Sequence, residues 1–106
     1  MYCMRVSYPK SDGSRFDFDY YRSQHMALCE ETLKDFGFRG YILQGPAGQG
    51  PGGDNLTWAS VDILFDSLES LQGAMANAGK IGADVVNYTD CKPHISFCPI
   101  ELYLQS

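Results

Sequence analysis

Basic residues are scarce in this sequence. Eight lysines and arginines stand against thirteen aspartates and glutamates, which gives a formal net charge of -5. The basic residues are spread along the chain and form no cluster. A protein that binds a nucleic-acid backbone needs a basic patch or stripe, because phosphate contacts dominate its affinity. The sequence therefore argues against a nucleic-acid partner.

Long apolar runs are missing as well. No segment approaches the roughly 20 consecutive apolar residues that a membrane-spanning helix needs. Residues 1–10, MYCMRVSYPK, lack both the charged region and the apolar region of a signal peptide. We therefore expect no membrane partner and a cytoplasmic location.

Paired cysteines of the C-x-x-C type, typical of many structural zinc sites, are also absent. The four cysteines are Cys3, Cys29, Cys91 and Cys98. Without a secretory pattern, we expect free thiols and no disulfide framework. His94 and Cys98 lie four residues apart, but that spacing suits a helix, and their segment is predicted to be a strand. We therefore expect no metal site.

What the sequence does have is enough apolar material for one core. It contains 106 residues, of which 44% are hydrophobic and 20% charged. Chains of this length typically form one domain with one hydrophobic core. We expect a single domain over residues 1–106.

Period-two alternation of apolar side chains predicts four strands. In the first, Tyr2, Met4, Val6 and Tyr8 share one face. The predicted strands cover residues 1–8, 39–44, 56–65 and 94–104, and the last is interrupted at Pro99, which suggests an edge or a bulge.

Apolar spacings of three and four residues predict two helices. The first begins at the N-cap Asp17 and ends at Gly37. The second begins at Asp66, which forms a capping-box-like pair with Glu69, and ends at Gly79. The segment IGADVVNYTDCKPH, residues 81–94, has no clear period and is predicted to be irregular.

The predicted order β-α-β-β-α-β is the ferredoxin-like plan, an α+β fold with an antiparallel sheet and two helices on one face. The other face is left bare. Side chains such as Trp58 and Leu64, or Tyr2 and Met4, would form an apolar patch there, depending on the strand register. A homodimer that stacks two sheets face to face would bury such a patch.

Residues 45–55, GPAGQGPGGDN, form a glycine-rich loop. The loop has no Lys-Ser or Lys-Thr pair at its end, and it precedes a strand instead of a helix. It therefore does not fit the context of a phosphate-binding loop.

His25 lies on the apolar face of the first predicted helix, together with Tyr21 and Leu28. A histidine in this position is either a hydrogen-bonded core residue or a proton acceptor that faces a cavity. The residues alone leave both interpretations open.

Two motifs resemble the EthD-like family of the dimeric α+β barrel superfamily. The first is Phe-Asp-x-x-Tyr-Tyr-x-x-x-His-Met, from Phe16 to Met26. The second is Ala-Asp-x-x-Asn-Tyr-Thr-Asp, from Ala83 to Asp90. Nearly the whole chain is covered in the same order, although the glycine-rich loop and Ala27, where a proline commonly stands, depart from many relatives.

The resemblance implies a homodimer whose subunits each hold a small hydrophobic metabolite between sheet and helices. Superfamily relatives include cofactor-free monooxygenases, polyketide cyclases, lactone isomerases and haem enzymes. For this chain it favours an enzyme without a cofactor that acts on an aromatic or polyketide-like metabolite in a degradation or biosynthetic pathway. A non-catalytic carrier of a pathway intermediate is the alternative, and a haem enzyme is a weaker one.

In that setting His25 becomes the candidate catalytic base, with a carboxylate partner expected between Asp84 and Asp90. The expected substrate-binding residues are Tyr20, Tyr21, Asp84, Asn87, Tyr88 and His94, with His94 at the cavity mouth. The glycine-rich loop is expected to act as a lid over the cavity.

Overall fold

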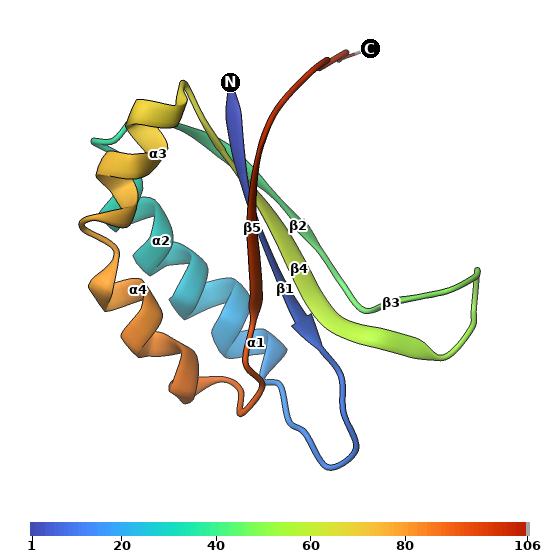
Figure 1. The fold of residues 1–106 in the computed structure, drawn as a ribbon. Helices are drawn as coiled ribbons and strands as arrows, with labels where there is room; N and C mark the ends of the chain where they lie inside the picture. Colours follow the sequence, from blue (N-terminus) through green and yellow to red (C-terminus); the bar gives the residue numbers. More distant parts are fainter. Residues whose placement is uncertain (106) are drawn as a thin grey trace.

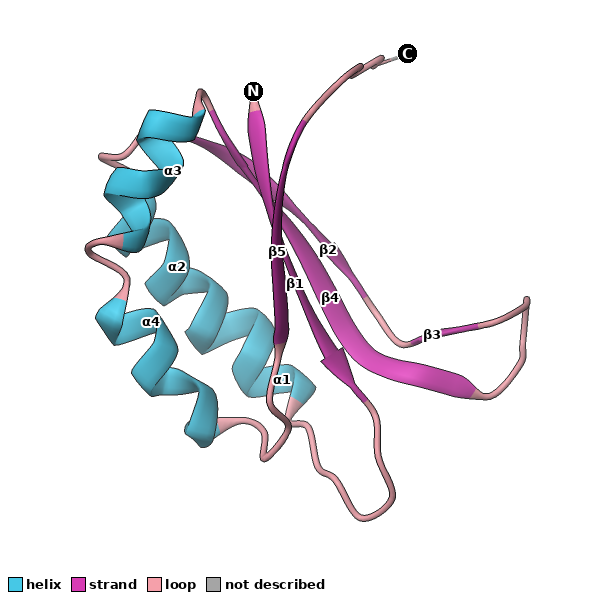
Figure 2. Ribbon diagram, viewed as in Figure 1, coloured by secondary structure: helices cyan, strands magenta, loops and turns pink. Residues whose placement is uncertain are grey.

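One antiparallel sheet carries all the helices on a single face (Figures 1 and 2). This arrangement is seen in a computed structural model, which describes residues 1–105. The strands are β1 (Tyr2–Pro9), β2 (Phe38–Gln44), β3 (Ala47–Gly48), β4 (Asn55–Phe65) and β5 (His94–Pro99). The sheet order is β2-β4-β1-β5, with the short β3 paired to β4. The predicted ferredoxin-like plan is confirmed.

The last strand is shorter than predicted. It ends at Pro99, and only Ile100 continues the pairing, by donating its N–H to the Met1 carbonyl. Proline has no N–H to donate to a strand ladder, so it ends the regular pairing.

The first helical segment comprises α1 (Phe18–Tyr20), η1 (Tyr21–His25) and α2 (Met26–Leu33), where η1 is a π-helical turn. The predicted N-cap is confirmed, because the Asp17 carboxylate accepts the Tyr20 N–H at 3.1 Å. Gly37 follows the helix with φ +67, and a side chain there would collide with Ser70 of the second helix. Only glycine fits this left-handed, tightly packed position.

The second helical segment differs from the prediction at both ends. It comprises α3 (Leu68–Met75), α4 (Gly79–Asp84) and the 3-10 turn η2 (Val85–Asn87). Ser67, not Asp66, is the N-cap, and its Oγ accepts the Ser70 N–H at 3.1 Å. Gly79 begins α4 instead of ending α3.

Much of the segment predicted to be irregular, residues 81–94, is therefore helical. Gly79 and Gly82 disfavour helix by intrinsic propensity. Contacts with α2, and the packing of the partly buried Ile81 and Val85 against the core, override that preference.

The core lies between the inner face of the sheet and the helices. Strand residues with period-two spacing supply one side, and α2 and α3 supply the other. The buried members are Met4, Val6, Tyr8, Ala59, Val61, Ile63 and Phe65 from the sheet, Tyr21, Met26, Cys29, Leu33, Leu71 and Ala74 from the helical segments, and Tyr88 from the loop after η2.

The helix-free face is more polar than predicted. Met4 is buried on the opposite, helix-covered side, and Tyr2 packs against the core there. A register shift beside Tyr8 places Trp58 against Phe16, with its indole N–H donating to Ser14. Neither predicted patch, Trp58 with Leu64 or Tyr2 with Met4, therefore forms on that face.

What the helix-free face presents instead is a hydrogen-bonded group around an ion pair. Arg5 Nε lies 2.8 Å from Asp62 Oδ1, and Gln44 bridges Asp62 to Ser60. Leu64 and Ile42 lie beside it, placed on this face by the strand alternation.

The glycine-rich segment forms a hairpin arm that projects from the sheet on the side away from the helices (Figure 1). Ala47 pairs with Thr57, and Gly48 with Asn55. The glycine-rich loop was expected to cover the cavity as a lid. In this structure it lies away from the helix side of the sheet and does not cover the cavity.

Candidate functional site

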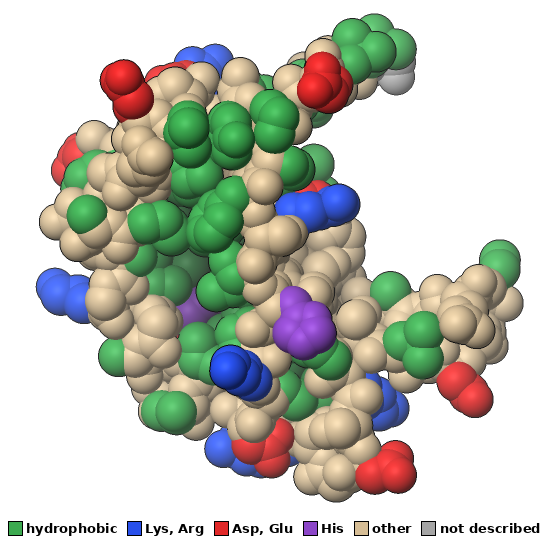
Figure 3. Space-filling view, viewed as in Figure 1, with side chains coloured by type: hydrophobic (Ala, Val, Ile, Leu, Met, Phe, Trp, Pro, Cys, Tyr) green, Lys and Arg blue, Asp and Glu red, His purple; other side chains and the backbone are tan. Residues whose placement is uncertain are grey.

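A cavity of 430 Å³ lies between the sheet and the helices, within the range of ordinary small-molecule sites. Its walls are almost entirely apolar. They include Met4, Val6, Met26, Cys29, Val61, Ile63, Met75, Ile81, Val85 and Ile95. Figure 3 shows apolar side chains gathered around a hollow between β5 and the helices, with a histidine at its depth.

The polar side chains of this cavity come chiefly from the π-helical turn and from β1. Tyr21 and His25 stand at the two ends of η1, and their rings stack with centroids 5.7 Å apart. The Met26 N–H bonds to the Tyr21 carbonyl, five residues back. Single π-turns inside α-helices occur frequently at functional sites. Here the turn places both rings beside the cavity, together with Tyr8.

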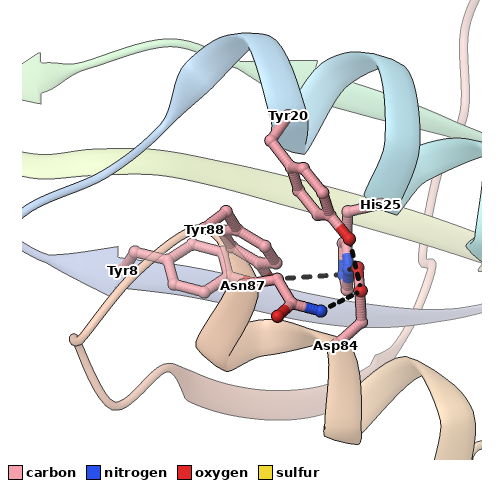
Figure 4. Close-up of polar contacts among 6 residues, drawn as sticks. All are labelled: Tyr8, Tyr20, His25, Asp84, Asn87 and Tyr88. Carbon is pink, nitrogen blue, oxygen red and sulfur yellow. Dashed lines mark hydrogen bonds and ion pairs between the residues drawn. The ribbon is translucent and has the colours of Figure 1, made fainter.

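His25 is held by a carboxylate from the other helical segment. Its Nδ1 lies 2.9 Å from Oδ2 of Asp84, the last residue of α4. The imidazole is nearly inaccessible, with its side chain 4% exposed. Figure 4 shows the two side chains meeting between the helices.

Asp84 is itself fixed by two further hydrogen bonds. The Tyr20 hydroxyl donates to its Oδ1 at 2.7 Å, and the Asn87 amide donates to the same oxygen at 2.9 Å (Figure 4). Tyr20 and Asn87 were expected to bind substrate. In the structure they orient the carboxylate that holds His25.

A chain of tyrosines continues from the other side of the imidazole. The Tyr88 hydroxyl lies 3.2 Å from His25 Nε2, and the Tyr8 hydroxyl lies 2.5 Å from that of Tyr88. Residues from β1, the first helix, α4 and the loop after η2 thus form one network, Tyr8–Tyr88–His25–Asp84.

Burial keeps this network uncharged except at Asp84. Burial lowers the pKa of His25 below its ordinary 6.5, against the Asp84 carboxylate, which would raise it. Burial would raise the pKa of Asp84, but hydrogen bonds from Asn87, Tyr20 and His25 outweigh it and keep the pKa below 3.8. Burial raises the pKa of Tyr8 to about 12 and also raises that of Tyr88. At neutral pH the site holds a neutral imidazole beside a carboxylate.

We expect this arrangement to lower the free energy of unfolding as the pH falls. A histidine whose pKa is lowered by folding contributes stability that is complete above the unfolded value of 6.5 and is lost as pH falls through the folded value. The free energy of unfolding should therefore decrease from pH 7.5 to 5.5, by at most about 1.4 kcal/mol per pH unit from this group. Denaturant titrations at each pH measure it.

The matched variants are His25→Gln and His94→Gln. His25→Gln should make the free energy of unfolding depend less on pH over this range. His94→Gln removes the exposed imidazole and should leave the pH dependence as in the wild type. Equal slopes in the wild type and His25→Gln would show that folding does not lower the pKa of His25.

His94 lies away from this site. It points from β5 to the helix-free face, opposite Ser7 of β1, and is exposed. It lines a separate hollow on that face with Arg5 and Asp62. Its predicted place at the cavity mouth is wrong, because strand alternation puts Ile95, not His94, on the cavity side.

Asp90 is a structural residue, since its carboxylate accepts the backbone N–H of Arg15 at 2.9 Å. Tyr8 is the network member that sequence reasoning missed. Alternation with Met4 and Val6 placed it on the inner face of β1, but nothing in the sequence joins it to Tyr88, eighty residues away.

Among residues 1–105, no group of three or more His, Cys, Asp or Glu side chains is placed to hold a metal ion. In the same residues, no helix is long and apolar enough to cross a membrane.

The family model of the EthD domain matches residues 14–92, which contain His25, Asp84 and Tyr88. The chain belongs to the EthD family. A search of curated proteins found no match. Among solved structures, an EthD-like protein from Ralstonia eutropha is similar at 29% identity and TM-score 0.84, over 95% of this chain and 92% of that one.

Two more distant structures share the fold of this EthD-family chain. A dimeric ferredoxin-like protein from an uncultured marine organism has 10% identity and TM-score 0.61, covering both chains in full, at 100% each. SnoaB, a cofactor-independent oxygenase from Streptomyces nogalater solved as a point mutant, has 10% identity and TM-score 0.51, over 99% of this chain and 96% of that one.

Proposed function

We propose that this EthD-family chain binds a small hydrophobic, aromatic or polyketide-like metabolite in its cavity and transfers a proton from it without a metal or cofactor. The observation that carries this proposal is the pairing of a buried, neutral imidazole with a carboxylate beside an apolar cavity. Such a pair is the arrangement of a general base whose positive charge, once formed, is stabilised.

In the proposed step, His25 Nε2 takes a proton from a carbon next to a carbonyl of the bound metabolite. The metabolite then approaches Nε2 in place of the Tyr88 hydroxyl, whose 3.2 Å contact is the longest in the network. Asp84 accepts the Nδ1–H and stabilises the imidazolium. The apolar walls exclude water from the enolate.

Two outcomes of the enolate are consistent with this site. Reprotonation or bond formation at another atom gives isomerisation or cyclisation, whereas reaction of the enolate with oxygen gives cofactor-free monooxygenation. The oxygenase SnoaB, which shares the fold, supports the second outcome as a chemistry that this scaffold accommodates. Either reaction would serve a degradation pathway or a pathway of secondary-metabolite biosynthesis.

Anthrone, a tricyclic ketone with acidic methylene protons, tests the proposal. In heavy water without oxygen, the protein should accelerate deuterium incorporation at the methylene carbon, followed by NMR. Under air, accelerated conversion of anthrone and oxygen to anthraquinone and water would assign oxygenation. Saturable binding of anthrone with the exchange rate of buffer alone would reject catalysis of enolisation and favour the carrier alternative.

We also propose that two chains form a homodimer through their helix-free faces. This face has a hollow of 570 Å³ and is flanked by two projecting segments, the hairpin arm and the C-terminal segment after β5 (Figure 1). In the C-terminal segment, Leu102 is 86% exposed to solvent and Leu104 is 85% exposed. Apolar side chains so exposed are typical of residues that contact a partner.

Light scattering after size-exclusion chromatography should give twice the 11.8 kDa chain mass. The double variant Ile42→Glu with Leu64→Glu places charge in the proposed interface and should raise the dimer dissociation constant at least about tenfold. The control Leu68→Glu, an exposed position at the start of α3, should remain dimeric. A monomeric wild type at micromolar concentration would contradict this assembly.

A further inference from the structure

The hydroxyl of Tyr21 is the one buried side-chain polar atom without a hydrogen-bond partner in residues 1–105. Tyr21 is 1% exposed, and its side chain lines the cavity. An unpaired buried hydroxyl is unfavourable, and in native proteins it usually has a specific explanation.

The proton count of the neighbouring network shows that none of its hydrogens is directed to Tyr21. Neutral His25 carries one N–H, and the carboxylate of Asp84 fixes it on Nδ1. Nε2 must then accept, so the Tyr88 hydroxyl donates to it. The Tyr8 hydroxyl in turn donates to Tyr88. Every hydrogen of this network is thus used within it. The Tyr21 O–H has no acceptor within hydrogen-bond distance among the described residues and remains free to donate.

We propose that Tyr21 donates a hydrogen bond to a carbonyl oxygen of the bound metabolite, so that the ligand class is an apolar ring ketone. This inference rests on the proposed function, because it assumes that the ligand enters the same cavity. An apolar hydrocarbon would leave the hydroxyl unpaired, whereas a ketone satisfies it without needing a donor of its own.

The position of Tyr21 fits the proposed proton transfer. Its ring stacks on that of His25. Both side chains line the same cavity, so a ketone bonded to Tyr21 would lie beside the imidazole. Burial and the neighbouring phenol of Tyr8 raise the pKa of Tyr21 well above its ordinary value. The phenol stays protonated, and it would stabilise the negative charge that develops on the oxygen of an enolate.

Fluorenone and fluorene test this inference, because they share a tricyclic frame and differ by one carbonyl group. Fluorenone has no proton next to its carbonyl, so binding is measured without reaction. Tyr21→Phe should weaken fluorenone binding about 3- to 10-fold and leave fluorene binding unchanged. Fluorescence titration measures both affinities.

The infrared carbonyl band of fluorenone gives a second readout that a purely structural role would not change. Binding to the wild type should shift the band to lower frequency, as hydrogen bonding does, and Tyr21→Phe should abolish the shift. The control Tyr2→Phe removes a β1 hydroxyl outside the cavity lining and should preserve both the affinity and the shift.

The outcomes separate this inference from the proposed function. If the wild type binds both probes but Tyr21→Phe changes neither the fluorenone affinity nor the band, the role of Tyr21 is overturned and the cavity stands. If the wild type binds neither probe, the ligand site itself is rejected, and the role of Tyr21 with it.

Discussion

His25→Ala is expected to slow deuterium exchange into bound anthrone by about 100- to 10,000-fold relative to the wild type, the usual contribution of a general base. The variant lacks the atom that accepts the proton. The apolar walls remain, so the dissociation constant of anthrone should change little. Exchange rates at saturating protein, measured by NMR without oxygen, give the comparison.

The control for this prediction is His94→Ala, which removes the other histidine of the chain, on the helix-free face. It should retain the wild-type exchange rate. Circular dichroism verifies that His25→Ala remains folded, because its loss leaves Asp84 and Tyr88 each without one partner. A folded His25→Ala variant that binds anthrone and exchanges it at the wild-type rate would show that His25 is not the base.

Asp84→Asn is the second variant with a large expected effect. It removes the charge that fixes the His25 tautomer and stabilises the imidazolium, while it keeps the size of the side chain. We expect anthrone exchange to fall at least about tenfold and the free energy of unfolding to fall by about 2 kcal/mol, since hydrogen bonds to a charged group are lost. Exchange rates and urea denaturation measure the two effects.

Tyr20→Phe is the matched control for Asp84→Asn. It removes one hydrogen bond to the same carboxylate but keeps the charge and the contact with His25. Its effect on the exchange rate should be clearly smaller. Equal rates for Asp84→Asn and the wild type would show that the carboxylate is structural and has no part in orienting the base.

Much of the fold follows from local patterns in the sequence. The alternation in β1 and β4, the Asp17 cap and the stop at Gly37 all act over a few residues, so they can be recognised along the chain. The residues around α4 do not follow such a pattern. Two glycines weaken the helical signal there, and contacts with distant residues stabilise the helix.

The candidate site shows the same division. The spacing of the first helix placed Tyr21 and His25 inward, and the family motif marked the segment that contains Asp84 and Tyr88. Their roles depended on distance in space. Tyr20 and Asn87 were expected to bind substrate, but in the structure they orient Asp84. His94 was expected at the cavity, but the strand alternation places it on the opposite face of the sheet.

The sequence by itself determined the family, the β-α-β-β-α-β order and the inward position of His25, because these depend on periodicity and on motifs of neighbouring residues. Only the tertiary structure decided that Asp84, Tyr88 and Tyr8 join His25 in one network, and that Tyr21 keeps a free hydroxyl. Those contacts join residues up to eighty positions apart. Packing, not local preference, brings them together.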